Sequence, residues 1–321
     1  MLVRHLGYFV ALARERHFAR AAALCNITQP TLSAAIRKLE TDLAAQLVIR
    51  DQRFVGLTPE GETVLRWAQR MLQDHDDLLT ELAGAQPGGL TGMLRLGVIP
   101  AAMPAVALLT TRFLAAHPRA TVDIRSLTSR AIQNGLDAYE LDAGLTYLDN
   151  EPLERVARVP LYRERYAFVA HRTHRFARKT SLRWQEAVAE RLCLLSEEMQ
   201  NRRVLDRVAR SLGAQIHPAV VSNSFLAVCA HLREGTLASI VPHSFFRLFG
   251  KAPDLVAIDL VEPVHTQAIG LVLAQREPRT AMAEAAARAA LQLELETALA
   301  PDRKPLSVRR THSLDAVSRR T

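Results

Sequence analysis

A helix with a small, polar outer face is predicted from Thr28 onward. Thr28 followed by Pro30 favours a helix start, because threonine caps free amides and proline is tolerated in the first turn. Apolar side chains at helical spacing then fall on one side, at Leu32, Ile36, Leu39 and Leu43. The opposite side carries Pro30, Ala34, Arg37 and Thr41. Small residues allow close approach, so this face suits the major groove of DNA.

Several side chains on and near this helix have types that read or hold DNA. Gln29 at the helix tip can pair bidentately with adenine, and Ser33 lies on the flank of the same face. Arg37, Arg50 and Arg53 are candidates for phosphate or minor-groove contacts, which fix register rather than sequence. The candidate DNA contacts are Thr28, Gln29, Pro30, Thr31, Ser33, Ala34, Arg37, Arg50 and Arg53.

An N-terminal domain over residues 1–58 would position these side chains. Apolar repeats predict two short helices before the helix at Thr28, which makes a helix-turn-helix, and residues 48–58 read as a two-stranded wing. A further helix is expected over residues 59–86, and its roughly 25 helical residues span about 38 Å, which is long for a small domain. It is either one long core helix or, as its place between two domains favours, a dimerisation helix. Its apolar stripe is Val64, Ala68, Met71, Leu72, His75, Leu78, Leu79 and Leu82.

Beyond the boundary at 86–89 the pattern changes to short apolar strands that alternate with helices. Such alternation predicts an α/β fold with a parallel sheet. The pattern restarts at Tyr166, which indicates two similar lobes, and an alanine-rich helix is expected over 281–299. The chain should cross between the lobes near 162–165 and 263–267. The expected units are residues 90–162 with 268–299 for the first lobe, 166–263 for the second, and 300–321 for a basic, disordered tail.

A ligand site is expected where strands of both lobes end. In open α/β sheets ligands lie beyond the carboxyl ends of strands, near helix N-termini. That rule selects the segments 99–103, 128–129, 146–147, 196–201 and 222–224. Because helix N-terminal amides attract anions, a small anion or a neutral polar ligand fits. The candidate effector-binding residues are Pro100, Ala101, Thr128, Ser129, Thr146, Ser196, Gln200, Asn201 and Asn223.

Composition and charge narrow the function classes. The chain has 321 residues, 49% of them hydrophobic, and no apolar run long enough to span a membrane. The net charge of +8 divides into +3 over residues 1–60, +4 over 301–321 and +1 over the rest. Three separated cysteines, Cys25, Cys193 and Cys229, argue against a zinc site or a disulfide framework. We expect no catalytic residue, cofactor or metal site, because nucleophile-elbow, P-loop and dinucleotide-binding motifs are all missing.

The motifs of residues 1–66 resemble the N-terminal signature of the LysR-type transcriptional regulators. The resemblance rests on the stretches 9–13, 18–24, 28–33, 36–40 and 57–61, together with Arg50. It implies a winged helix-turn-helix, a linker helix that dimerises, and a two-lobed effector domain like periplasmic binding proteins. It also implies binding to double-stranded DNA at interrupted inverted repeats in promoters, a homotetramer, and RNA polymerase as a partner if the protein activates. Ala34 departs from the family, where a long polar residue is usual.

Three functions follow as hypotheses. The first is a cytoplasmic, DNA-binding transcription regulator that responds to a small effector and is not an enzyme. The second is a redox-sensing regulator of the same fold, in which Cys193 pairs with Cys229. The third is a solute-binding or catalytic α/β protein with an N-terminal interaction module. Thiol titration separates the first two, and a gel shift separates both from the third.

Overall fold

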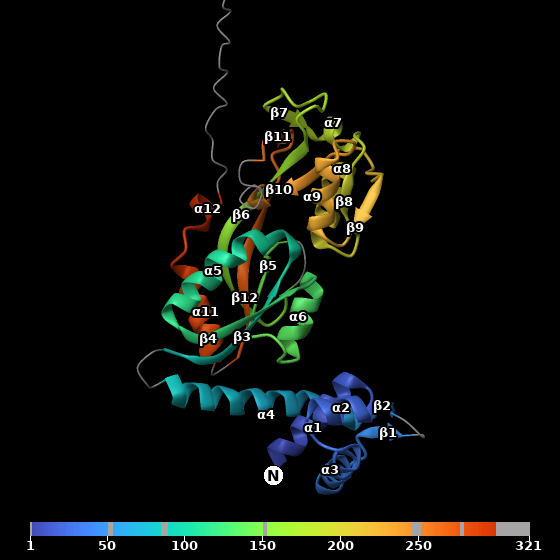
Figure 1. Cartoon of the computed structure of the whole chain (residues 1–321), viewed down its shortest axis with the longest axis vertical. Coiled ribbons are helices and arrows are strands. Elements are labelled where there is room, and N and C mark those ends of the chain that lie inside the picture. Colours follow the sequence, from blue (N-terminus) through green and yellow to red (C-terminus); the bar gives the residue numbers. More distant parts are fainter. Residues whose placement is uncertain are drawn as a thin grey trace, which may run out of the picture.

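The N-terminal part of the computed structural model is a three-helix domain with a wing (Figure 1). The structure describes residues 2–50, 54–84, 89–149, 153–245, 252–276 and 279–299. Helices α1 (Leu2–Glu15), α2 (Phe18–Leu24) and α3 (Gln29–Asp42) pack around a buried core that includes Phe9, Leu32 and Ile36. Strands β1 (Val48–Arg50) and β2 (Phe54–Leu57) pair antiparallel as the predicted wing. Leu43, predicted in the apolar stripe, is instead 42% exposed, because α3 ends at Asp42.

Helix α4 (Pro59–Gly84) begins where the sequence predicted. The Thr58 hydroxyl caps it by accepting from the Gly61 amide at 2.9 Å. Its first half packs on α1 through Val64, Ala68 and Leu72. Farther along, Leu78, Leu79 and Leu82 are each more than half exposed. The apolar stripe therefore serves the N-terminal core at one end and faces outward at the other.

The first lobe of the C-terminal part is built on a mixed sheet rather than a parallel one. Strands β4 (Arg119–Ser126), β3 (Thr91–Val98) and β5 (Ala143–Tyr147) run parallel. Strands β12 (Thr266–Ala274) and β6 (Val156–His171) then continue the sheet antiparallel. The prediction of a parallel sheet was wrong at these two strands, because they carry the chain between the lobes and back.

Helices cover the first lobe on both faces of its sheet (Figure 1). A short 3₁₀ turn, Pro100–Ala102, leads into α5 (Met103–Ala116), and α6 (Ser129–Asp137) follows β4. The predicted helix over 281–299 is two helices, α11 (Ala281–Leu291) and α12 (Leu295–Ala298), separated at residues 292–294.

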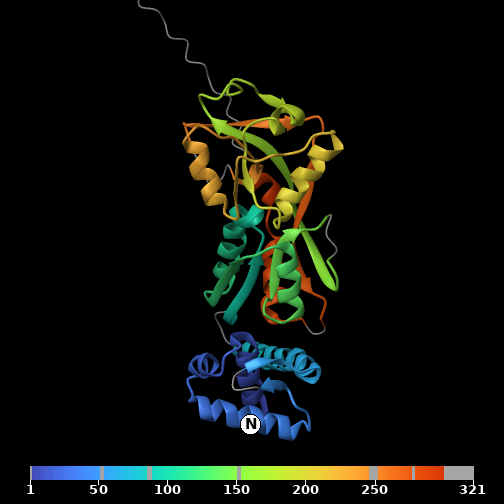
Figure 2. The same cartoon turned by 90° about the vertical axis from the view of Figure 1, so that its right-hand side faces the viewer.

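The second lobe has its own strands and helices above the first (Figures 1 and 2). Strand β6 pairs there with β10 and β11, and β11 pairs with β7. Strands β8 and β9 form a separate parallel pair. The bounds are β7 (Ser181–Arg183), α7 (Trp184–Val188), β8 (Cys193–Leu195), α8 (Gln200–Ser211), β9 (Val220–Ser222), α9 (Phe225–Arg233), β10 (Ser239–Pro242), a 3₁₀ turn (His243–Phe245) and β11 (Leu255–Val261).

Two adjacent strands join the lobes. Strand β6 pairs with β12 as far as Arg165 and with β10 from Tyr166 onward, so the crossing lies between these residues. Strand β12 begins at Thr266, opposite Arg165. These positions coincide with the segments where the apolar pattern breaks, 162–165 and 263–267. The sequence pattern missed the first half of β6, because its alternating charged residues hide a strand that is only half-buried.

Some predictions fall outside the described residues. They concern Arg53 in the wing, residues 85–88 after the linker helix, and the tail from 300 to 321. Among the helices that the structure does describe, none has the length and apolar character that crossing a membrane would require.

Candidate DNA-binding helix and inter-lobe pocket

The N-terminus of α3 is formed by a local hydrogen-bond network. The Thr28 hydroxyl accepts from the Thr31 amide at 3.3 Å, and the two threonine hydroxyls lie 2.8 Å apart. Pro30 stands in the first turn, where its missing amide hydrogen has no helical partner to lose. The remaining free amides and the positive end of the helix dipole make this tip attractive to phosphate.

The outer face of α3 is open to solvent. Figure 1 shows α3 at the end of the molecule remote from the second lobe. The side chain of Ser33 is half-buried on the flank, and Arg37 lies on the open face. Lys38 beside it forms an ion pair with Asp42 at 2.7 Å. The exposed candidates are Thr28, Gln29, Pro30, Thr31, Ala34 and Arg37. Arg50 is the last residue of β1, and its side chain lies outside the part of the chain that the structure describes.

Glu40 on α3 positions the wing. Its Oε1 accepts from the amides of Leu47 and Val48 at 3.0 and 3.2 Å. The sequence showed only a carboxylate on the flank of the helix. The structure shows that this carboxylate holds the start of β1 against α3.

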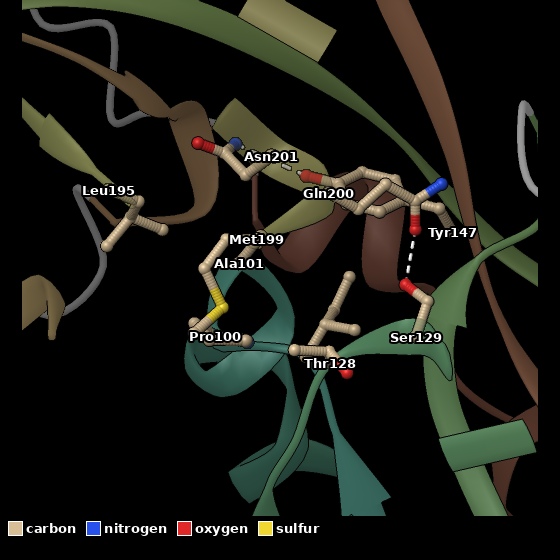
Figure 3. A pocket seen from close by; sticks show the side chains of 10 residues that line it. Pro100, Ala101, Thr128, Ser129, Tyr147, Leu195, Met199, Gln200 and Asn201 are labelled. Carbon is tan, nitrogen blue, oxygen red and sulfur yellow. Dashed lines mark hydrogen bonds between the residues drawn. The ribbon is translucent and has the colours of Figure 1, made fainter. Parts of the chain in front are cut away.

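A pocket opens between the lobes at the strand ends that the sequence selected. Its cavity volume is only about 10 Å³, room for roughly one water molecule and far below the roughly 300–1,000 Å³ of drug-sized sites, so the lobes are closed on each other here. Figure 3 shows the side chains that line it. Ile99, Pro100, Ala101, Thr128, Ser129 and Tyr147 come from the first lobe, and Leu195, Met199, Gln200 and Asn201 come from the second.

A hydrogen bond joins the two lobes across this pocket. The Ser129 hydroxyl, at the N-terminus of α6, donates to Oε1 of Gln200, at the N-terminus of α8 (Figure 3). Thr146 stands behind Ser129, fully buried, and its hydroxyl donates to Ser129 Oγ at 3.1 Å. The Gln200 side-chain amide donates to the Asp149 carbonyl at 3.2 Å. The lobes are therefore held together by residues at the pocket itself.

Thr128 caps a helix and also lines the pocket. Its hydroxyl accepts from the Ala131 amide at 3.1 Å and so caps α6. On the opposite wall, the Asn201 amide donates to the Tyr147 hydroxyl at 3.3 Å, and that hydroxyl donates to Glu164 Oε1 at 2.7 Å. Burial raises the pKa of Glu164 to about 8, because the ionised carboxylate would lose its water.

Two predicted effector residues lie elsewhere. Asn223 is exposed and directly follows the end of β9, where Ser222 pairs with Leu195. Ser196 donates to Glu198 at 2.6 Å and lines a separate groove with Arg202 and His217. The sequence did not indicate Leu195 or Glu164 as residues at or next to the pocket. The alternation Tyr162, Glu164, Tyr166 in a strand was the available signal for Glu164.

The cysteines lie outside the pocket wall. Cys193 is buried on β8, and Cys229 is half-buried on α9. Burial raises the pKa of both thiols and that of Cys25, and the proximity of Cys193 and Cys229 raises the pKa of Cys229 further. A raised pKa lowers the fraction of reactive thiolate at neutral pH.

Comparisons with known proteins agree with both parts of the fold. The hydrogen peroxide-inducible genes activator of Dickeya chrysanthemi is 31% identical over 198 residues, 61% of this chain and 64% of that protein. The chain therefore matches just under two thirds of this relative's length. A full-length OxyR variant from Pseudomonas aeruginosa has a TM-score of 0.73 at 26% identity, covering 92% of this chain and 97% of that chain. Full-length CbnR in complex with its target DNA shares the fold, with a TM-score of 0.65 at 22% identity over 91% of this chain and 99% of that one.

Family models match nearly the whole described chain. The bacterial regulatory helix-turn-helix protein of the lysR family matches residues 3–62, and the LysR substrate binding domain matches residues 87–294. The first covers α1 to the start of α4, and the second covers both lobes. The family consists of transcription regulators and not of enzymes. The chain therefore belongs to the family of LysR-type transcriptional regulators.

Proposed function

We propose that this protein binds operator DNA through α3 and that a small molecule between the lobes changes that binding. The observation that carries the DNA half is the solvent-exposed, small and polar face of α3, with Thr28 as its cap. Gln29 would read a base, Pro30 and Ala34 would allow close approach, and Arg37 would hold phosphate. Because the chromosome is the target, the protein would work in the cytoplasm.

We further propose that two copies pair through α4. The exposed apolar side chains of its distal half would bury each other in a dimer. A two-fold dimer presents two α3 helices, which matches an interrupted inverted repeat in a promoter. The family resemblance adds a tetramer made of two such dimers, and RNA polymerase as a partner if the protein activates.

The effector proposal rests on the pocket between the lobes. Helices α6 and α8 begin at Ser129 and Gln200 and aim their free amides at the same space from opposite sides. An acidic group on a small ligand would be stabilised there. Because Ser129 and Gln200 now bond each other, a ligand that competes for them would change how the lobes are held.

The DNA half is tested by a gel shift with the DNA upstream of the protein's own gene. We expect specific binding at low salt that weakens as salt rises, because phosphate contacts release counterions. Equal affinity for this DNA and for unrelated DNA of the same length would contradict sequence-specific recognition.

The effector half is tested with Ser129→Ala. The change removes the hydroxyl that links the lobes but spares the Thr128 cap of α6. We expect the ligand dose-response in the gel shift to move about tenfold or more, since a bond to a charged ligand is worth ~1.5–3 kcal/mol. Asn223→Ala, outside the pocket, is the matched control. An unchanged dose-response in Ser129→Ala would move the site elsewhere.

A redox sensor remains a second proposal, because relatives of this chain are named for hydrogen peroxide induction. The raised pKa of Cys193 and Cys229 favours the ligand-binding proposal over it. Thiol titration before and after peroxide decides between them. Loss of two thiols per chain together with a change in DNA binding would support the redox sensor.

A further inference from the structure

A groove lies wholly within the second lobe and shares no lining residue with the inter-lobe pocket. It is formed by the loop after β8, the first turn of α8, the loop before β9 and β9 itself. Its volume is about 580 Å³, within the roughly 300–1,000 Å³ of small-molecule sites. We call it the second-lobe groove, and its lining includes Glu197, Glu198, Arg202, Ile216, Pro218 and Val221.

A buried arginine forms part of the wall of this groove. Arg202 is only 4% exposed, and a charged side chain is almost never buried so far unless it is paired. Its Nε donates to Asp206 Oδ1 at 3.0 Å, and its Nη1 donates to the Leu195 carbonyl at 3.3 Å. These two bonds fix the guanidinium plane against α8 and the end of β8.

The third nitrogen of this guanidinium has no such bond. Among the described residues, Arg202 Nη2 meets a carboxylate only at Glu197 Oε1, 3.8 Å away, which is longer than a hydrogen bond. The side chain of Glu197 is 81% exposed, so water competes with this contact and screens it. A carboxylate that enters the groove can take the place of Glu197 at Nη2, because its two oxygens match the planar guanidinium fork.

Another part of the wall is apolar. Ile216 is buried there, and Pro218 and Val221 line the groove beside it. Val221 is 52% exposed, so a ligand that covered it would remove apolar surface from water. The groove therefore suits a carboxylate that is attached to an apolar body rather than a bare anion.

Two glutamates at the groove limit what else such a ligand can carry. The Ser196 hydroxyl donates to Glu198 at 2.6 Å and lowers the pKa of Glu198, so this carboxylate is ionised at neutral pH. Arg203 holds the same loop, because its Nη1 donates to the carbonyls of Glu197 and Glu198 at 3.1 and 2.7 Å. A second acidic group on the ligand would meet like charges there and be repelled. A monocarboxylate is thus favoured over a dicarboxylate.

The groove also adjoins the contacts that hold the lobes together. Gln200 bonds Ser129 and Asn201 bonds Tyr147, both in the first lobe. Gln200 and Asn201 directly precede Arg202 in the first turn of α8. A ligand that pulled on Arg202 would therefore act on the helical turn that contacts the first lobe.

We propose that the second-lobe groove is a further small-molecule site, which binds a monocarboxylate with an apolar body through Arg202. The ligand carboxylate replaces Glu197 at Nη2, and the apolar body covers Ile216, Pro218 and Val221. This site is separate from the inter-lobe site of the proposed function and does not depend on it. From the first turn of α8, its ligand alters the contacts between the lobes.

The test measures binding of named probes to the full-length protein by calorimetry, with ligand-observed NMR for weak binding. The probes are isocaproate and hydrocinnamate, the neutral amide of each, and adipate, which carries a second carboxylate at the far end of a similar chain. Each probe is titrated into the wild type, Arg202→Lys and Glu197→Gln. Arg210→Lys, at an exposed position of the same helix, is the matched control.

We expect at least one monocarboxylate to bind the wild type and the control alike, and its amide and adipate to bind about tenfold or more weakly. Arg202→Lys should weaken the monocarboxylate about tenfold or more, because lysine keeps the charge but not the fork. Glu197→Gln should strengthen it about threefold, because the competing carboxylate is removed. The two variants act in opposite directions, which a general loss of folding cannot imitate. If Arg202→Lys fails to fold, Glu197→Gln, altered at an exposed side chain, still tests the site.

Other outcomes overturn the proposal in distinguishable ways. Equal binding of the amides would show an apolar site without a carboxylate anchor. Unchanged affinity in both Arg202→Lys and Glu197→Gln would place the bound acid outside the second-lobe groove. If that binding were lost in Ser129→Ala, the acid would lie between the lobes, and the proposed function would stand while the groove proposal failed. No binding by any probe would also overturn the groove proposal.

Discussion

The two proposed binding regions treat their polar groups in opposite ways. On α3 most of the reading side chains face solvent, and Thr28 and Thr31 are committed to the local hydrogen bonds that form the helix start. In the inter-lobe pocket the polar side chains are buried and bond each other, as Ser129 and Gln200 do across the lobes. A rigid exposed face suits a large partner that arrives from outside. A pocket whose groups already pair suits a ligand that must compete with the protein itself.

The largest expected effect concerns dimerisation through α4, which DNA binding is proposed to require. Leu79→Lys places a charge in the exposed apolar part of α4, where Leu79 is 53% exposed. Burying that charge in a dimer is costly, so operator affinity should fall about a hundredfold, with a monomer by sedimentation. The stability of the monomer should hardly change. Thr63→Lys, at an exposed polar position of the same helix, is the control, and an intact Leu79→Lys dimer would remove α4 as the seam.

The next largest effect concerns the buried carboxyl of Glu164 and the pH dependence of the protein's stability. The pKa of Glu164 is raised by burial from its ordinary 4.5 to about 8, so the folded state holds a proton that the unfolded state releases. This contribution is fully present below about pH 4.5 and is lost as pH rises toward 8. Urea unfolding at about pH 6 and about pH 8 should differ by roughly 2–3 kcal/mol from this group. Glu164→Gln should be correspondingly less pH-dependent, and the same slope in both proteins would show that Glu164 is ionised throughout.

A smaller effect tests base reading by the exposed face. Gln29→Ala should relax base preference at one position of each half-site and cost ~1–3 kcal/mol there. Gel shifts against an operator set with single base changes measure it. The domain should keep its stability, since the side chain is exposed. Parallel loss of specific and non-specific affinity would assign Gln29 to phosphate instead.

The smallest expected effect separates a cap from a ligand contact. Thr128→Val removes the cap of α6 and should lower the free energy of unfolding by about 1 kcal/mol. If the hydroxyl also meets the ligand, the dose-response should move about tenfold or more while effector-free DNA affinity is kept. Thr280→Val removes the corresponding cap of α11, far from the pocket, and controls for stability alone. Equal behaviour of the two variants would make Thr128 a cap only.

The sequence predicted the DNA side more fully than the effector side, for a physical reason. Helix period and caps are local, so α3, its cap and its open face followed from residues 28–42. Most of the pocket wall also followed, because strand ends and helix starts are readable from chain order. The mixed sheet did not, since strand direction in β6 and β12 depends on partners far along the chain. Glu164 was missed because its link to the pocket wall runs through Tyr147 and Asn201, which are distant from it in sequence.

One contact that belongs to neither binding region joins helix α4 to the first lobe. Arg95 on β3 donates from its side chain to Gln73 on α4 at 3.2 Å, and its backbone amide donates to Asp142 at 2.7 Å. Gln73 lies 14 residues beyond Pro59, so α4 forms a lever arm of about 21 Å toward the winged domain. A tilt of about 10° at this fulcrum would displace the far end by roughly 4 Å, comparable to the ~3.4 Å rise of one base step. A small rotation of the first lobe would thus shift the winged domain along the operator by about one base step.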